Sequence, residues 1–161
     1  MKNIKQRITL DLPATECHER FIQDIDDWWP KDYTWFKDPN AEMCIDVDDS
    51  GKCIEKDPSG KEITWGRVLE NEKGKEIEML WKIDSEREEI QRPEASSRVR
   101  ITFSQESDDS TTMEVTHSEL EKSGEQAEDY HALLESDDGW LYLLRSFKSH
   151  CQRSTPPDGT E

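Results

Sequence analysis

The segment from Ile63 to Ile83 (ITWGRVLENEKGKEIEMLWKI) constrains the fold of this chain more than any other. It contains two apolar runs, which the polar stretch Asn71 to Lys75 separates. In the second run apolar side chains occupy every other position, at Ile77, Met79, Trp81 and Ile83. Because successive side chains of a strand point to opposite faces, this alternation places all four on one face of a sheet. We therefore expect a curved antiparallel hairpin with a core or a cavity against that face.

Similar alternation predicts further strands on both sides of the hairpin. They cover Lys2 to Leu10, Met43 to Val47, Lys52 to Lys56, Val99 to Phe103 and Met113 to His117. Turn-forming residues follow several of these runs, for example in the segment DDSG that ends at Gly51. The chain therefore alternates short strands and tight turns over most of its length.

Two helices are expected. The word Pro13-Ala14-Thr15 follows the first strand, with Thr15 as the expected N-cap, and apolar residues then recur at helical spacing as far as Trp28. Near the other end Ser136-Asp137-Asp138 is expected to cap a helix from Gly139 to about Gln152. The segment Glu119 to Glu135 is polar and is predicted as a loop with some helix.

The predicted order is one strand, a helix, about six strands and a long helix, which places the chain in the α+β class. A strongly curved antiparallel sheet can wrap a C-terminal helix and bury its apolar face. The length of 161 residues suits one domain, expected over residues 1–153. Residues 154–161 contain the pair Pro156-Pro157 and are predicted to form a disordered tail.

The charge of the chain argues against nucleic acid and membrane partners. There are 38 acidic and 21 basic residues, giving a net charge of −17. The basic residues are scattered, so we expect neither a phosphate-binding patch nor attraction to an anionic membrane. The acidity has two interpretations, adaptation to a salty environment or an ordinary acidic protein, and the sequence does not choose between them.

The N-terminal residues form a predicted strand without the apolar core of a signal peptide, and no run reaches transmembrane length. A cytoplasmic location is therefore expected. The four cysteines, Cys17, Cys44, Cys53 and Cys151, show no C-x-x-C spacing and are expected to be reduced. Cys44 and Cys53 are expected to be able to face each other across a hairpin.

Several short sequence motifs, in their order and spacing, resemble those of a known superfamily. They are the opening strand with PAT, WGRVLE at Trp65–Glu70, MLW at Met79–Trp81, VTHSE at Val115–Glu119 and DDGW at Asp137–Trp140. The chain resembles the SRPBCC superfamily, also called START-like or birch-pollen-allergen-like. Within it, the chain is most similar to homologues of the activator of the ninety-kilodalton heat-shock protein ATPase. The resemblance covers roughly residues 4 to 150.

The resemblance implies a helix-grip fold with a cavity between the sheet and the last helix. Cavities in that superfamily usually hold apolar or aromatic small molecules. Together with the inward parity of the strands, it predicts a set of cavity-lining residues, namely Met79, Trp81, Phe103, Met113, Val115, His117, Trp140 and Leu144. For each of them, filling the core is the alternative.

Two polar residues of the strands have alternative roles. His117 shares parity with Met113 and Val115, so it is either a ligand-facing or proton-transferring group or a hydrogen-bonded core histidine. Arg67 either points inward and binds a carboxylate or points outward and pairs with an acid. Catalytic residues cannot be assigned from the sequence.

No metal site or cofactor is expected. His18, His131 and His150 lack ligand spacing with one another, and the acidic turns lack the pattern of a calcium loop. There is no phosphate-binding glycine loop and no nucleophile elbow.

The main functional hypothesis is binding of a small hydrophobic or aromatic molecule. A cyclase- or hydratase-like enzyme that uses His117 or Tyr142 for proton transfer is a second hypothesis. A protein-binding module that acts on a chaperone is a third, suggested by the family name.

Overall fold

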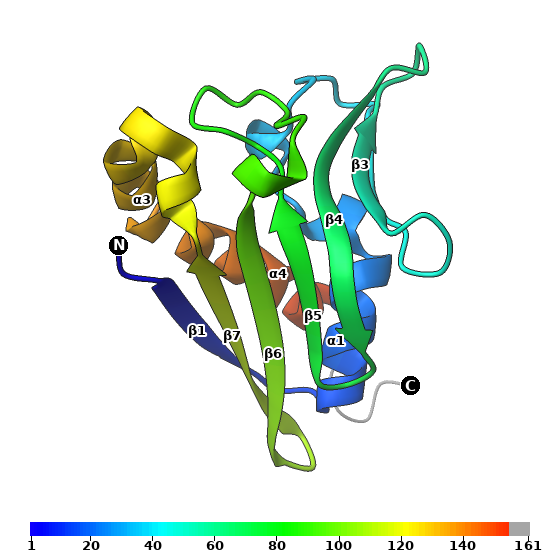
Figure 1. The fold of residues 1–161 in the computed structure, drawn as a ribbon. Coiled ribbons are helices and arrows are strands. Elements are labelled where there is room, and N and C mark those ends of the chain that lie inside the picture. Colours follow the sequence, from blue (N-terminus) through cyan, green and yellow to red (C-terminus); the bar gives the residue numbers. More distant parts are fainter. Residues whose placement is uncertain (155–161) are drawn as a thin grey trace.

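The computed structural model describes residues 1–154. Ser154, the first residue of the predicted tail, is the last residue of the C-terminal helix, and the rest of that tail lies outside the described residues. Seven strands form one antiparallel sheet in the order β1-β7-β6-β5-β4-β3-β2 (Figure 1). The strands are β1 (Ile4–Leu10), β2 (Glu42–Ile45), β3 (Lys52–Lys56), β4 (Glu62–Glu72), β5 (Glu76–Trp81), β6 (Ser97–Ser107) and β7 (Ser110–Ser118). The α+β class, the strand number and the long C-terminal helix are all confirmed.

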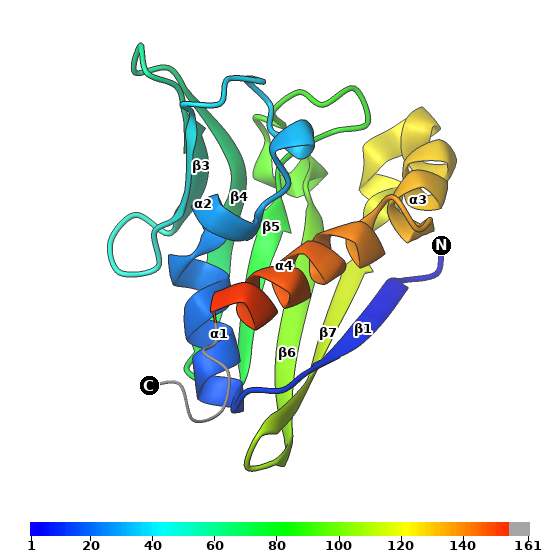
Figure 2. The ribbon, with the colours of Figure 1, turned by 180° about the vertical axis from the view of Figure 1, so that it is seen from behind.

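The helices lie mainly on the concave side of the sheet. They are α1 (Ala14–Gln23), α2 (Ile25–Trp28), α3 (Ala127–Glu135) and α4 (Trp140–Ser154), with short 3-10 helices η1 (Lys31–Tyr33), η2 (Pro93–Ala95) and η3 (Leu120–Gln126). Helix α4 crosses the sheet from the α3 side toward α1 (Figure 2). The curved sheet and this helix together form a helix-grip fold.

Alternation builds the core as the sequence predicts. Ile77, Met79 and Trp81 of β5 are buried, and so are Val99, Ile101 and Phe103 of β6. The register pairs Met79 with Val99 and Phe103 with Met113, which carries the apolar face from strand to strand. The opposite face holds cross-strand ion pairs, for example between Arg100 and Glu76 at 2.9 Å.

Three local expectations are wrong. Helix α1 begins at Ala14, with Pro13 as N-cap, so Thr15 lies within the first turn. The Ala14 N–H instead donates to the side chain of Gln105, over 2.7 Å. The segment 119–135 is mostly helical, as η3 and α3. The register pairs Cys44 with Ile54 and Cys53 with Ile45, so the two thiols point to opposite faces.

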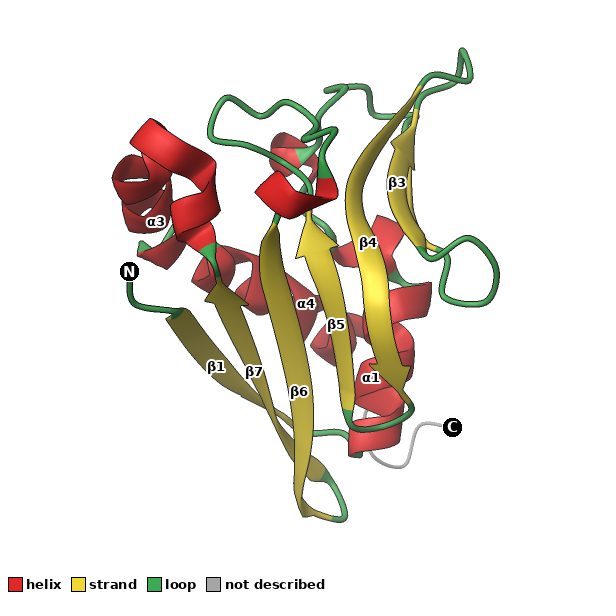
Figure 3. Cartoon of the chain, in the orientation of Figure 1, coloured by secondary structure: helices red, strands yellow, loops and turns green. Residues whose placement is uncertain are grey.

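The two ends of the sheet differ. At one end the β6–β7 hairpin extends past α1, whereas at the other end η1, the loop between β5 and β6, and α3 gather around the start of α4 (Figures 1 and 3). We call the second end the loop end. None of the described helices is long and apolar enough to cross a membrane.

Candidate functional site

A hollow of about 240 Å³ opens at the loop end of the fold. Its walls come from η1 and the residues on either side of it, the end of β5 and the loop that follows, α3, and the start of α4. The lining is Trp29, Tyr33, Trp35, Trp81, Ile83, Asp84, Ser85, Arg87, Tyr130, Leu133, Leu134, Asp138, Gly139 and Leu143. Aromatic and aliphatic side chains form most of this wall, and the charged groups stand at Asp84, Arg87 and Asp138.

Hydrogen bonds tie the elements around the hollow to one another. The Tyr33 hydroxyl donates to the Asp138 carbonyl over 2.6 Å, which links η1 to the start of α4. Arg87 Nη2 donates to the carbonyl oxygens of Tyr33 and Thr34, at 3.3 and 3.2 Å, which links the β5–β6 loop to η1. The rim is therefore built from segments far apart in sequence and held in one arrangement.

Tyr130 and Trp81 close the inner wall of the hollow. The Trp81 indole N–H donates to the Tyr130 hydroxyl over 2.7 Å, and that hydroxyl donates to the Ile83 carbonyl, also over 2.7 Å. Burial raises the pKa of Tyr130 above its usual value. The phenol is therefore protonated at neutral pH, and its proton is engaged by a backbone carbonyl.

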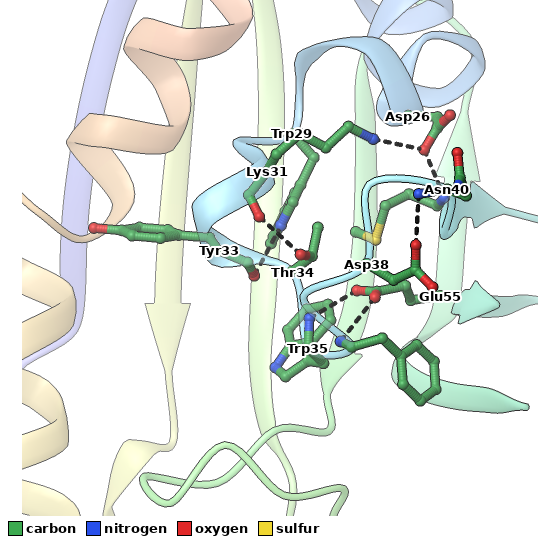
Figure 4. Close-up of polar contacts among 11 residues, drawn as sticks. Asp26, Trp29, Lys31, Tyr33, Thr34, Trp35, Asp38, Asn40 and Glu55 are labelled. Carbon is green, nitrogen blue, oxygen red and sulfur yellow. Dashed lines mark hydrogen bonds and ion pairs between the residues drawn. The ribbon is translucent and has the colours of Figure 1, made fainter. Parts of the chain in front are cut away.

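A buried carboxylate shapes the segment that carries Trp35. Glu55 lies on the inward face of β3 and is fully buried. Its two oxygens accept the backbone N–H groups of Trp35 and Phe36, each over 2.9 Å (Figure 4). Hydrogen bonds from two backbone amides compensate the desolvation of this charge. Glu55 thereby positions the Trp35 segment at the edge of the hollow.

Of the eight residues predicted to line a ligand cavity, Trp81 is in the wall of this hollow. The other seven predicted residues are all buried, but they are not among those that line it. These seven are Met79, Phe103, Met113, Val115, His117, Trp140 and Leu144. Six of them belong to the apolar core, and His117 is a buried polar residue beside that core. Their proposed ligand contacts therefore stay predictions, while their inward orientation is observed.

His117 lies behind Trp81 and is closed off from solvent, with 0% of its surface exposed. Trp140 Nε1 donates to His117 Nδ1 over 2.9 Å, so the ring proton belongs on Nε2, which is 2.7 Å from Ser97 Oγ. Burial lowers the pKa of His117 to about 3. A neutral histidine with both nitrogens bonded is a core group, and it is poorly placed for proton transfer.

Two other polar residues weighed from the sequence lie elsewhere. The Tyr142 hydroxyl donates to the Asp32 carboxylate over 3.3 Å and is not part of the hollow lining. Arg67 is exposed on β4, on the outward side of the sheet. The inward alternative for Arg67 is therefore wrong.

Sequence reasoning missed most of the lining. Tyr130, Leu133 and Leu134 lie in the segment predicted mainly as loop, where a Tyr-x-x-Leu-Leu pattern at helical spacing was the available signal. Trp29 and Trp35 flank η1. The many aromatic residues in that part of the sequence could have indicated that it forms one wall of a hollow.

A second, larger hollow of about 470 Å³ lies between α1 and the β2 edge of the sheet. Much of its lining is polar or charged, including Glu19, Asp46 and Lys73. His18 forms part of it, with Nε2 2.7 Å from Asn71 Oδ1 and Nδ1 accepting the Gly74 N–H at 3.2 Å. Both ring nitrogens are thus used to hold the β4–β5 turn against α1.

One group among the described residues could hold a metal ion. Ligand atoms of Asp24, Asp27 and His150 lie within 4.8 Å of one another. His150 Nε2 is 2.9 Å from Asp24 Oδ2, an ion pair when the imidazole is protonated.

The fold and the hollow define a helix-grip protein with an aromatic-lined opening beside its C-terminal helix. The family model described as activator of Hsp90 ATPase homolog 1-like protein matches residues 23–152. The chain belongs to this family, which lies within the superfamily that the sequence words resemble. A search of curated proteins found no match.

Solved structures share the fold across nearly the whole chain. The anthrahydroquino-γ-pyrone synthase Txn09, complexed with SUM, is 25% identical with a TM-score of 0.65, covering 92% of this chain and 96% of its own. CalC, a self-sacrificing resistance protein from Micromonospora echinospora, is 18% identical with a TM-score of 0.68, covering 97% of each chain. The di-domain ARO/CYC protein BexL is 16% identical with a TM-score of 0.61, covering 98% of this chain and 48% of its own.

Proposed function

We propose that this protein binds a small, flat, mainly apolar molecule in the hollow at the loop end. The observation that carries the proposal is the aromatic wall of Trp29, Trp35, Trp81 and Tyr130 around about 240 Å³. This volume lies just below the usual range for drug-sized ligands and suits a molecule of two or three fused rings. The structural likeness to Txn09, which was solved in complex with SUM, supports a small-molecule role.

Binding without catalysis is favoured over a cyclase-like reaction. Such a reaction needs a group that can exchange a proton with the bound molecule. His117 is sealed behind Trp81, and Tyr142 lies outside the hollow. Tyr130 lines the hollow, but its hydroxyl already donates a hydrogen bond to the Ile83 carbonyl.

A chaperone partner, which the family name suggests, is also less well supported. Docking of a protein usually uses a contiguous apolar patch. Among residues 1–154 the exposed large hydrophobic side chains are Met1, Leu69 and Leu133, and they lie on different elements. The described surface therefore does not favour docking through an apolar patch.

Fluorescence titration with N-phenyl-1-naphthylamine, a neutral apolar probe, tests the proposal. We expect saturable binding at about one site, with enhanced probe emission. Leu143→Trp adds bulk at a lining position of α4 and should abolish the binding. Ile22→Trp adds the same ring to the second hollow and should leave the binding unchanged. Circular dichroism checks that both variants fold, and binding lost in Ile22→Trp but kept in Leu143→Trp would assign the probe to the other hollow.

A further inference from the structure

Two aspartates stand close together where helix α1 meets helix α2. Asp24 is both the C-cap of α1 and the N-cap of α2, and Asp27 follows three positions later in α2. The Asp24 carbonyl accepts the backbone N–H of Asp27 over 2.8 Å, which fixes the turn between them. Residues three apart in a helical turn share one face, so the backbone holds two like charges side by side.

His150 brings an imidazole to these carboxylates from α4. The C-terminal part of α4 lies beside the α1–α2 junction (Figure 2). His150 Nε2 is 2.9 Å from Asp24 Oδ2, and ligand atoms of all three residues lie within 4.8 Å of one another. The His150 side chain is only 12% exposed, whereas Asp27 is exposed. The group is therefore anchored on the protein side and open to solvent at Asp27.

The surroundings of this group favour a positive ion. Each carboxylate carries a charge of −1, while the imidazole is neutral or carries a single positive charge. Two helices also end here, because Asp24 follows the last residue of α1 and His150 stands near the end of α4. The C-terminal end of a helix carries a partial negative charge, which attracts cations.

The donor set suits a transition-metal ion. Zn²⁺ binds histidine nitrogen and aspartate oxygen at about 2.0–2.2 Å, whereas Ca²⁺ and Mg²⁺ take oxygen ligands. Two ligand atoms on one Zn²⁺ are therefore about 3–3.5 Å apart. The 2.9 Å between His150 and Asp24 is close to that separation. The Asp27 carboxylate has no hydrogen bond or ion pair among residues 1–154, so no such contact there opposes a small rotation onto the ion.

We propose that Asp24, Asp27 and His150 bind a divalent transition-metal ion, with zinc as the best match and water in the remaining positions. The ion would join the α1–α2 junction to α4 as a structural clip. The inference is independent of the proposed ligand site, because none of the three residues lines the loop-end hollow. Local spacing could not indicate this site, since His150 is 126 residues from Asp24.

Isothermal titration of the metal-free protein with zinc chloride at neutral pH tests this inference. We expect about one zinc ion per chain, in line with a single three-ligand site. Asp27→Asn and His150→Gln each remove a ligand and should weaken binding at least about tenfold, because changing even a residue behind a ligand costs about 10–100-fold. Circular dichroism checks that the variants fold. Zinc binding that is unchanged in His150→Gln would overturn the inference.

Two further variants serve as controls. His131→Gln is the matched one, because His131 on α3 has the carboxylate of Glu135 at 3.9 Å but takes no part in the three-residue group. Cys44→Ser removes the exposed thiol, the chief competing zinc ligand. Both variants should bind zinc as the wild-type protein does. Binding lost in Cys44→Ser would assign the zinc to the thiol and overturn the inference.

Nitrogen-15 spectra of the histidine rings and thermal melts of the wild-type protein provide readouts that need no variant. Of the four histidines, one should shift when zinc is added, and calcium at the same concentration should shift none. Zinc should also raise the melting temperature by about 5–10 °C at a free concentration about a hundred times its dissociation constant. Shifts in several histidines, equal binding of calcium or an unchanged melting temperature would overturn the inference and leave the proposed function standing.

Discussion

Trp140 donates its indole N–H to Nδ1 of His117 over 2.9 Å, and this bond fixes which nitrogen of the histidine carries the proton. The indole comes from the first residue of α4 and the imidazole from β7, so the bond ties the helix to the sheet. The other histidine nitrogen faces Ser97 on β6. His117, for which the sequence left a catalytic role open, therefore has a structural role: it clamps the helix to the sheet.

The clamp predicts a specific pH dependence of stability. The pKa of folded His117 is lowered to about 3 by burial, whereas an unfolded histidine titrates near 6.5. Between these values the unfolded chain binds a proton that the folded chain does not. The stabilising contribution is therefore complete above pH 6.5 and is lost as the pH falls toward 3, by at most about 1.4 kcal/mol per pH unit.

Urea unfolding at pH 6, 5 and 4 measures this slope. The wild-type free energy of unfolding should fall more steeply than that of His117→Gln, which cannot titrate there. Carboxylates contribute to both proteins, so the difference between the two slopes isolates the histidine. Parallel slopes would mean that solvent reaches His117 in the folded state.

The link between Trp81 and Tyr130 predicts two graded losses of stability. Trp81→Ala deletes a buried indole and should destabilise the protein by ~3–5 kcal/mol. Tyr130→Phe keeps the ring but leaves the Ile83 carbonyl and the Trp81 N–H without their partner, so a loss of about 1–3 kcal/mol is expected. Denaturant melts report both values, and a loss under about 1 kcal/mol for Trp81→Ala, the usual range for surface sites, would contradict the burial.

Much of the fold could be predicted because period-two alternation is a local property of the sequence. It gave the hairpin of β4 and β5, and it gave β3 at its observed bounds of Lys52–Lys56. The start of α1 could not be found in the same way, because Gln105, 91 residues away, bonds the N–H of Ala14. Helix α3 was predicted only as some helix within a loop, because its sequence is mostly polar and its buried residues Tyr130 and Leu134 belong to the core of the folded protein.

The candidate site was predictable only in part, for a related reason. Parity places Trp81 and His117 on the inward face, and both are buried there. Which inward residues reach a hollow depends on how η1, α3 and the β5–β6 loop meet, and contacts such as Tyr33 to Asp138 decide that. Tyr33 and Asp138 are 105 residues apart, so a local pattern of apolar residues cannot predict that they meet.

Glu55 provides a prediction about the Trp35 segment. Glu55→Ala removes the acceptor of two buried backbone N–H groups and should destabilise the protein by about 2–4 kcal/mol. Amide hydrogen exchange at Trp35 and Phe36 should become faster, because their protection comes from this carboxylate. Glu62→Ala removes an exposed carboxylate on β4 and serves as the matched control. Unchanged exchange at Trp35 in Glu55→Ala would show that other contacts hold the segment.

The four cysteines predict a simple pattern of thiol reactivity. Cys44 is exposed on β2, whereas Cys17, Cys53 and Cys151 are buried. Burial raises the pKa of Cys17 and of Cys151 to about 11 and also raises the pKa of Cys44, so access of the reagent to the sulfur is what separates Cys44 from the buried thiols. We expect Ellman's reagent to modify about one thiol quickly in the native protein and all four after unfolding. Cys44→Ser should remove the fast phase, and a fast phase that survives this substitution would show that a second cysteine becomes accessible in the native state.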